Sequence, residues 1–224
     1  MPIALKYKAV IFDYGEVIWM QSRNIHVYKQ IEEDNNLAEN SLVDTLTSSE
    51  LSQILPAMFQ HNLLIGQYTA EEFDEFFTKA YNKKFGTDFK KLKFFSAIEY
   101  DKDAIYEEAV LHMCLILREM GIKTALMLDT YHVDDSRKGR KLPGMDKYFD
   151  YIFESCLEGV KKPDPKFFKV VLDRLDVDPS EVIFIDDAKA NCNTAKSLGM
   201  NVIRVENSFD MLEDLQEMLG FELD

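Results

Sequence analysis

The sequence predicts an α/β fold in which a parallel sheet carries helices on both faces and an all-helical segment is inserted after the first strand. Three observations lead to this prediction. Short apolar runs alternate with longer segments of helical period, as expected when helices connect parallel strands. The runs are apolar at almost every position, which is typical of strands buried on both faces. Residues 20–100 contain helical patterns and no convincing strand.

Five apolar runs are the candidate strands. They cover residues 8–12, 124–128, 151–153, 182–185 and 201–205. Runs of this length are typical of buried strands rather than of helices. The helical stretch separates the first run from the other four, so we expect a large insertion between the first and second strands.

Four segments outside the insertion have the apolar spacing of amphipathic helices. They are residues 103–120, 163–175, 188–198 and a last helix after residue 208. Gly121 follows the first of these segments as a C-cap, and Pro163 begins the second. We expect the hydroxyl of Ser208 to cap the last helix, with Phe209 on its apolar face.

The insertion also contains a recognisable helix start. Thr69 and Glu72 have the spacing of a capping box, and a stripe of Phe and Tyr residues follows them. We therefore expect residues 1–19 and 101–224 to form the core domain and residues 20–100 to form an inserted helical domain.

Composition limits the possible partners. The chain has 26 Lys and Arg against 40 Asp and Glu, a formal net charge of −14, which argues against nucleic acid or an anionic membrane as partner. An apolar content of 46% with 16 Phe excludes a disordered chain. No run approaches the roughly 20 apolar residues of a membrane span. The three cysteines are widely spaced and odd in number, so we expect core thiols in a cytoplasmic protein.

Acidic residues follow three of the predicted strands. Asp13 follows the first strand, Asp129 the second, and Asp186 and Asp187 the fourth. Ligands bind at the carboxyl ends of parallel strands, where these acids would meet. Converging carboxylates repel one another unless a cation lies among them, and oxygen ligands suit Mg²⁺. The sequence therefore predicts a Mg²⁺ site at this edge of the sheet.

A pair of lysines precedes the helix predicted at residues 163–175. Beside a Mg²⁺ site, Lys162 would help to hold a phosphoryl or carboxylate group between two positive charges. Lys161 is adjacent and is the alternative for the inward-facing lysine.

The acids and the lysine occur in a distinctive order along the chain. The order is Asp13, then Lys162-Pro163-Asp164-Pro165, then Asp186-Asp187 and Asn191. This order resembles the haloacid dehalogenase superfamily, and the resemblance covers essentially the whole chain. The segments at residues 12–18 and 66–73 are similar to the phosphatase-like branch related to the N-terminal domain of soluble epoxide hydrolase.

The resemblance implies a Rossmann-like core with a helical cap inserted after the first strand. It also implies that Asp13 attacks a phosphoryl group to form an aspartyl-phosphate, which water then hydrolyses. The Mg²⁺ ligands that it implies are Asp13, the carbonyl oxygen of Gly15, Asp186 and Asp187, the last as a ligand or as support for one. Lys162 would neutralise the charge of nucleophile and phosphate, and Asn191 would position the loop that carries the metal ligands.

Two positions depart from the family pattern. Most phosphatases of the superfamily have a second Asp two residues after the nucleophile, an acid/base typically worth about 10²–10⁴ in rate; here that position is Gly15, with Glu16 next to it. Family members also end the second strand with Ser or Thr, often followed by Asn. Those positions fall on Leu128 and Asp129, unless a two-residue slip brings Thr130 into the hydroxyl role.

Three functions compete on this basis. The first is a Mg²⁺-dependent phosphatase that acts weakly on a small phosphorylated metabolite, with Asp129, Thr130, Lys162 and Trp19 contacting the substrate. The second is a catalytically inactive relative that binds or scaffolds an unknown protein partner. The third is another reaction of the same nucleophile, such as dehalogenation, although the sequence shows no halide pocket. His132, close to the predicted site, would be a proton donor in the first case.

Overall fold

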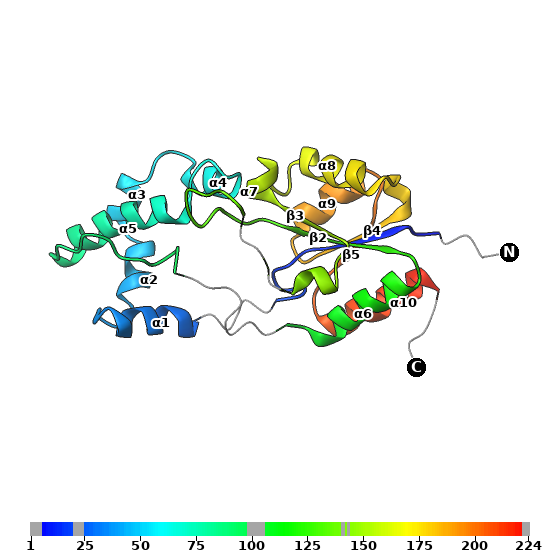
Figure 1. Ribbon diagram of the computed structural model, residues 1–224, viewed down its shortest axis with the longest axis horizontal. Helices are drawn as coiled ribbons and strands as arrows, with labels where there is room; N and C mark the ends of the chain where they lie inside the picture. Colours follow the sequence, from blue (N-terminus) through cyan, green and yellow to red (C-terminus); the bar gives the residue numbers. More distant parts are fainter. Residues whose placement is uncertain (1–5, 20–24, 98–105, 140–141, 143, 221–224) are drawn as a thin grey trace.

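The computed structural model describes residues 6–19, 25–97, 106–139, 142 and 144–220 (Figure 1). At its centre is a five-stranded sheet of order β3-β2-β1-β4-β5 in which all neighbouring strands are parallel. The strands are β1 (Ala9–Phe12), β2 (Lys123–Leu128), β3 (Tyr151–Glu154), β4 (Val182–Asp186) and β5 (Asn201–Arg204). The predicted α/β fold with a parallel sheet is confirmed.

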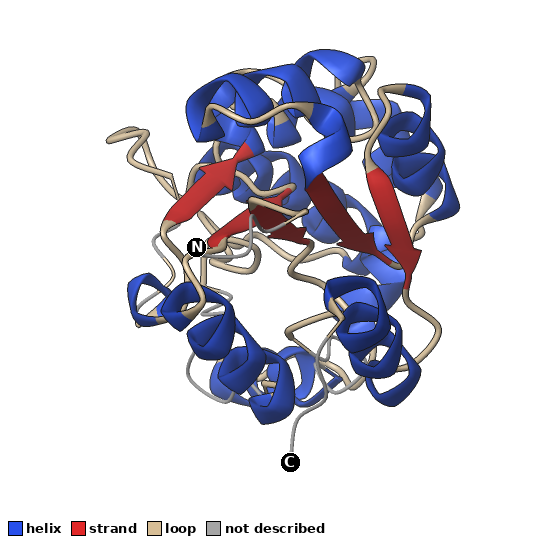
Figure 2. Ribbon diagram, turned by 90° about the vertical axis from the view of Figure 1, so that its right-hand side faces the viewer, coloured by secondary structure: helices blue, strands red, loops and turns tan. Residues whose placement is uncertain are grey.

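Helices cover both faces of the sheet, as Figures 1 and 2 show. They are α6 (Glu108–Glu119) and α10 (Ser208–Leu219) on one face, and α8 (Pro165–Leu175) and α9 (Lys189–Ser197) on the other. Alternate strand residues point to opposite faces, so Val10 and Phe12 pack with α6 and α10, whereas Ala9 and Ile11 pack with α8 and α9. The strands are apolar throughout because both faces are buried.

Among the described residues, five helices lie between β1 and α6 in the chain and to one side of the sheet in Figure 1. They are α1 (Ile25–Asp34), α2 (Ser41–Leu46), α3 (Ser49–Ile54), α4 (Phe59–Leu64) and α5 (Ala70–Phe85). These helices enclose a separate apolar cluster rich in Phe and Tyr. The predicted capping box is confirmed: Thr69 Oγ accepts from the Glu72 N–H, and the Glu72 carboxylate accepts from the Thr69 N–H at 2.7 Å.

The expectation that residues 20–100 are helical throughout is wrong for residues 86–97, which contain no helix. Gly86 ends α5 in the left-handed conformation, with φ +67°, and the amide of Asn82 then bonds to the backbone N–H and carbonyl of Phe89. The predicted domain boundaries fall on or beside residues 20–24 and 98–105, which lie outside the described residues. The division into two domains therefore stays a prediction.

The structure also corrects several predicted helix ends. Asn207, not Ser208, caps α10, because its Oδ1 accepts from the Asp210 N–H at 2.9 Å. Phe209 is 68% exposed and so is not part of the apolar face. Helix α8 begins at Pro165 because Asp164 is its N-cap. Residues 103–105 of the helix predicted at residues 103–120 lie outside the described residues, and α6 begins at Glu108.

Two further findings concern the whole described chain. All three cysteines are buried and none forms a disulfide, as expected for core thiols. Among the described residues, no helix combines the length and the apolar character needed to cross a membrane.

Candidate active site

The carboxyl ends of β1 and β4 bring three acids together. Phe12 pairs with Ile185 in the sheet, and the Asp13 N–H continues this pairing by donating to the Ile185 carbonyl oxygen at 2.8 Å. Asp13 therefore lies level with the end of β4, where Asp186 and Asp187 follow. Each of the three acids offers a carboxylate oxygen, and these oxygens lie within 4.8 Å of one another.

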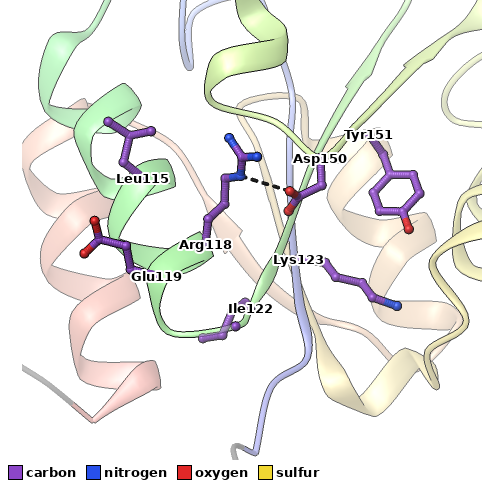
Figure 3. A pocket seen from close by; sticks show the side chains of 8 residues that line it. Leu115, Arg118, Glu119, Ile122, Lys123, Asp150 and Tyr151 are labelled. Carbon is purple, nitrogen blue, oxygen red and sulfur yellow. Dashed lines mark hydrogen bonds and ion pairs between the residues drawn. The ribbon is translucent and has the colours of Figure 1, made fainter.

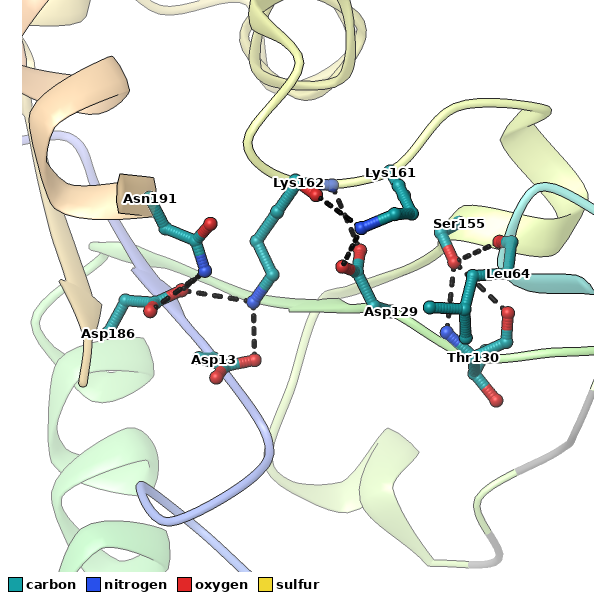
Figure 4. Close-up of polar contacts among 9 residues, drawn as sticks. All are labelled: Asp13, Leu64, Asp129, Thr130, Ser155, Lys161, Lys162, Asp186 and Asn191. Carbon is teal, nitrogen blue, oxygen red and sulfur yellow. Dashed lines mark hydrogen bonds and ion pairs between the residues drawn. The ribbon is translucent and has the colours of Figure 1, made fainter. Parts of the chain in front are cut away.

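Lys162 lies among these acids. Its Nζ is 2.5 Å from Asp13 Oδ1 and 3.0 Å from Asp186 Oδ2, and the residue is 3% exposed (Figure 4). The side chain of Lys161 points instead toward Asp129, with 3.7 Å between Nζ and Oδ2. Of the two candidate lysines, Lys162 is therefore the inward-facing one.

Asn191, on the first part of α9, fixes the orientation of Asp186. Its Nδ2 lies 3.0 Å from both carboxylate oxygens of Asp186. The Ala188 N–H also donates to Asp186 Oδ1, at 2.8 Å. Asp186 is fully buried, so these donors hold a carboxyl group that has no access to water.

The ionisation of the cluster follows from burial and from the charges around it. Burial raises the pKa of Asp13 to about 6, against the opposing effect of Lys162 and with a further raising effect of Asp186. Burial alone would lower the pKa of Lys162, but attraction to Asp13, Asp186 and Asp129 outweighs it and the pKa lies above its ordinary value. Lys162 therefore keeps its positive charge. This single charge does not balance the negative charge of the acids around it.

A divalent cation fits this imbalance. Three carboxylates converge on one another, and one ammonium group contacts two of them. Hard oxygen donors at this spacing are the ligands that Mg²⁺ prefers. Gly15, the fourth predicted ligand, lines the same cavity as Asp13. The donor set therefore suits the predicted metal.

A cavity of about 230 Å³ opens beside Asp13. Its lining consists of Asp13, Tyr14, Gly15, Trp19, Leu128, Asp129, Thr130, Leu142, Lys162 and Asn191. The rings of Tyr14 and Trp19 stack at a centroid distance of 5.7 Å and form an aromatic wall. Seven of the nine predicted site residues line the cavity, and the other two are Asp186 and Asp187. Asp13 belongs both to the cavity lining and to the cluster of acids.

A larger hollow of about 790 Å³ lies at the opposite end of the sheet (Figure 3). It is bordered by the end of α6 and the start of β2, and an ion pair between Arg118 Nε and Asp150 Oδ1 (2.9 Å) crosses it. It contains none of the acids that follow the strands. Because ligands of parallel sheets bind at the carboxyl ends of the strands, the smaller cavity is the candidate active site.

A family model described as haloacid dehalogenase-like hydrolase matches residues 7–199. The chain belongs to this family. The match agrees with the resemblance inferred from the motif order.

Two relatives of this hydrolase are much longer than the chain. Acyl-CoA dehydrogenase family member 10 of Mus musculus is 30% identical over 217 residues, which cover 97% of this chain and 20% of the relative. Bifunctional epoxide hydrolase 2 of Sus scrofa is 32% identical over 117 residues, 51% of this chain and 21% of the relative. The second match agrees with the resemblance to the branch related to soluble epoxide hydrolase. The chain spans about a fifth of the length of these relatives.

Solved structures share the fold of this hydrolase. One is a HAD family enzyme from Bacteroides thetaiotaomicron in complex with magnesium and inorganic phosphate, with a TM-score of 0.60 and 22% identity. The superposition covers 89% of this chain and 94% of that enzyme. The predicted Mg²⁺ cofactor agrees with the metal found with that enzyme.

Strand β2 ends at Leu128, and Asp129 and Thr130 follow it. The pairing of β2 with β3 runs unbroken from Ala125 with Tyr151 to Leu128 with Glu154. Figure 4 shows Thr130 on the far side of Asp129 from Asp13. The Thr130 N–H donates to Ser155 Oγ at 2.9 Å. Leu128 and Thr130 both line the cavity, so the choice between them for the position of the family hydroxyl stays a prediction.

Asp129 has a different environment from the one expected of a substrate ligand. Its Oδ1 accepts a hydrogen bond from the backbone N–H of Lys162 at 3.0 Å. Burial raises the pKa of Asp129, and the charge of Lys162 lowers it. The carboxylate thus contacts the lysine-bearing loop as well as the cavity, and its negative charge is partly compensated.

Two weaker candidates are not brought into the cavity. His132 Nδ1 accepts from the Gly139 N–H at 3.2 Å, and neither His132 nor Glu16 is among the residues that line the cavity. Burial and the nearby Arg137 also lower the pKa of His132. The expected proton donor at His132 is therefore not supported.

Sequence reasoning missed Ser155. It is fully buried and contacts the loop that contains Thr130. A serine between a strand and a short helix matches no motif, and only the three-dimensional contacts reveal it.

Proposed function

We propose that this hydrolase is a Mg²⁺-dependent phosphatase that cleaves a small organic phosphate through an aspartyl-phosphate at Asp13. The supporting observation is the position of Asp13, which borders the cavity while its carboxylate bonds to the buried ammonium group of Lys162. A carboxylate held in this way beside a metal site is suited to attack phosphorus, because the positive charge of the site attracts the phosphoryl oxygens.

Mg²⁺ would be held by Asp13, Asp186 and the carbonyl oxygen of Gly15, with Asp187 as a further ligand or as support for one. When bound, the ion would supply positive charge that stabilises the phosphoryl oxygens in the transition state. Asn191 keeps Asp186 oriented toward this site through its bonds to both carboxylate oxygens.

In the first step, one carboxylate oxygen of Asp13 bonds to phosphorus as the phosphorus–oxygen bond of the ester breaks. The bonding electrons leave with the alcohol oxygen, which takes its proton from water because Gly15 offers no acid. Lys162 keeps its charge, which favours the ionised Asp13 and the entering phosphate.

In the second step, water attacks phosphorus and the bond between phosphorus and Asp13 breaks. This releases inorganic phosphate and restores the Asp13 carboxylate. With glycine at position 15 and leucine at position 128, the reaction lacks a positioned acid/base and one donor. A positioned acid/base is worth about 10²–10⁴ in rate and one such donor about 10²–10³, so we expect weak activity.

The cavity limits the leaving group to a small one. Its volume is about 230 Å³, and the stacked rings of Tyr14 and Trp19 form one wall. We expect Trp19 to contact the leaving group and Lys162 to contact the phosphoryl group.

A second candidate function is a HAD-fold pseudoenzyme that binds or scaffolds a partner. The observation that favours it is the pair Gly15 and Leu128, because both line the cavity where the family has an acid and a hydroxyl. The protein would then keep the fold and the metal site without turnover.

Phosphate release from a panel of small organic phosphates, with Mg²⁺ present, tests these two functions. We expect weak activity that chelation removes and that Asp13→Asn abolishes. No phosphate release above background with any member of the panel favours the pseudoenzyme. Activity that survives Asp13→Asn excludes Asp13 as the nucleophile.

A further inference from the structure

Ser155 is a fully buried residue that joins two segments far apart in the sequence. It is the first residue of α7 (Ser155–Glu158). Its Oγ accepts from the Thr130 N–H at 2.9 Å and donates to the carbonyl oxygen of Leu64 at 2.6 Å (Figure 4). The Thr130 carbonyl oxygen, at 3.1 Å, is the more distant acceptor for the same proton. One hydroxyl therefore joins the end of α4 to the loop after β2.

A second, independent feature keeps the end of α4 close to α7. Gly66, in the turn after α4, has φ +76°, and a Cβ on this residue would overlap the carbonyl oxygen of Cys156. Glycine is suited to this position because it tolerates both the left-handed conformation and the close approach. The close packing of this turn against Cys156 keeps the Leu64 carbonyl within reach of Ser155.

The loop after β2 also contacts the inserted helices at other points. The Ala70 N–H donates to the His132 carbonyl oxygen at 2.8 Å. The ring of Tyr131 stacks on that of Phe95 at a centroid distance of 4.6 Å. The loop is therefore attached along its length to the inserted residues between β1 and α6, and the Ser155 contact is the one next to the candidate active site.

The same loop holds the backbone of the inward-facing lysine. Asp129 precedes Thr130, and its Oδ1 accepts from the Lys162 N–H at 3.0 Å. Lys162 Nζ in turn contacts Asp13 at 2.5 Å. A shift of the loop would thus move the ammonium group relative to the nucleophile. A displacement of about 1 Å in such a geometry can cost on the order of 10² in rate.

We propose that Ser155 is a positioning residue, whose hydroxyl transmits the position of α4 to the loop after β2 and, through Asp129, to Lys162. The inference rests on the proposed function, because the position of Lys162 affects turnover only if Asp13 is the nucleophile. The contacts themselves can be tested without turnover.

The test compares Ser155→Ala with Ser41→Ala in the full, Mg²⁺-loaded chain. Ser41 is a matched control because it is 1% exposed and its Oγ accepts from the Tyr81 hydroxyl at 3.1 Å, within the inserted helices. The readouts are kcat and KM for p-nitrophenyl phosphate, the amide hydrogen-exchange rate of Lys162 by NMR, and the unfolding midpoint.

Ser155→Ala is expected to lower kcat and to speed exchange of the Lys162 amide, each by about tenfold, the change that loss of one hydrogen bond produces. KM should change little, because the groups that contact substrate are retained. Ser41→Ala should lower the unfolding midpoint and leave kcat and Lys162 exchange at the parent values.

Amide exchange separates the failure of this inference from the failure of the proposed function. If the parent chain shows no turnover, the proposed function fails, and faster Lys162 exchange in Ser155→Ala still supports the positioning contacts. Exchange at the parent rate overturns the inference, whatever kcat does. Equal effects of Ser155→Ala and Ser41→Ala on Lys162 also overturn it, because general loss of stability then explains both.

A second variant serves if Ser155→Ala does not fold. Ser155→Cys keeps a side chain of similar size with a weaker donor. In Ser155→Cys, the exchange rate of the Lys162 amide should be higher than in the parent and lower than in a chain whose loop after β2 is fully disrupted. Exchange at the parent rate in the folded Ser155→Cys variant overturns the inference.

Discussion

Leu128 and Gly15 are the two residues at which the sequence predicts a departure from the family pattern. Restoring a hydroxyl and an acid with Leu128→Ser and Gly15→Asp should raise kcat/KM for an aryl phosphate by about 10²-fold or more, since each group alone is worth at least that. Steady-state hydrolysis with Mg²⁺ measures the effect. The same pair in an Asp13→Asn background is the control and should show no gain. A folded, Mg²⁺-binding double variant without a gain contradicts the account of these residues.

Asn191 is expected to matter through Asp186. Asn191→Ala removes the amide that bonds to both Asp186 oxygens, so the Mg²⁺ dissociation constant should rise about 10–100-fold, as when groups supporting metal ligands are lost. Isothermal titration calorimetry measures it. Asn193, exposed on the same helix, provides the control: Asn193→Ala should bind Mg²⁺ as the parent does, and equal weakening in both variants argues against the role of Asn191.

Asp13 should make the stability of the metal-free chain depend on pH. Burial raises the pKa of Asp13 from its ordinary value of 3.8 to about 6, so between these pH values the folded chain binds more protons than the unfolded chain. The free energy of unfolding should therefore fall as pH rises from about 4 to about 6, by at most roughly 3 kcal/mol. Urea unfolding with a chelator at each pH measures this. Asp13→Asn should flatten the dependence, and an unchanged slope contradicts the assignment.

At the scale of single elements, Asp74 connects α5 to the segment that contains no helix. It is fully buried and accepts hydrogen bonds from the backbone N–H groups of Phe95 (2.6 Å) and Ser96 (3.2 Å) and from the Ser96 hydroxyl. Burial raises the pKa of Asp74, and these donors lower it.

Asp74→Ala leaves these buried donors without their acceptor, so we expect a loss of about 2–4 kcal/mol in the free energy of unfolding. Denaturant unfolding measures the loss. Glu75→Ala, at the exposed neighbouring position on α5, should change stability by less than about 0.5 kcal/mol. Similar losses in the two variants would show that the Asp74 contacts contribute little.

The elements were predictable where local chemistry decides them. Apolar runs predicted all five strands, and the capping box at Thr69 predicted the start of α5. The errors occurred where side chains compete for one role. Asn207 and Ser208 are both good N-caps, and only the structure shows that Asn207 bonds to the Asp210 N–H. The bonds from Asn82 that hold residues 86–89 likewise have no sequence signature.

At the scale of the whole molecule, the parallel sheet assembles the site. Asp13 and Lys162 are 149 residues apart in the chain, yet the acids could be predicted to meet because the carboxyl ends of parallel strands share an edge. The contact of Asp129 with the Lys162 backbone and the role of Ser155 could not be predicted. Both depend on how loops from different strands pack, and no period or motif encodes that packing.

The whole fold also gives a physical reason for a metal requirement. Three carboxylates converge at the sheet edge, and the ammonium group of Lys162 contacts two of them, those of Asp13 and Asp186. A phosphate with negative charge is repelled by such a cluster unless further positive charge is present. The net charge of −14 strengthens this repulsion rather than relieving it.

The central claim is that Asp13 accepts the phosphoryl group. It is tested most directly by acid-quenching the Mg²⁺-loaded hydrolase during turnover of p-nitrophenyl phosphate and examining the peptide that contains Asp13 by mass spectrometry. The account predicts a phosphoryl group on Asp13 that is absent after chelation and in Asp13→Asn. A phosphoryl group on another residue, or no phosphoryl group and no phosphate release, would contradict it.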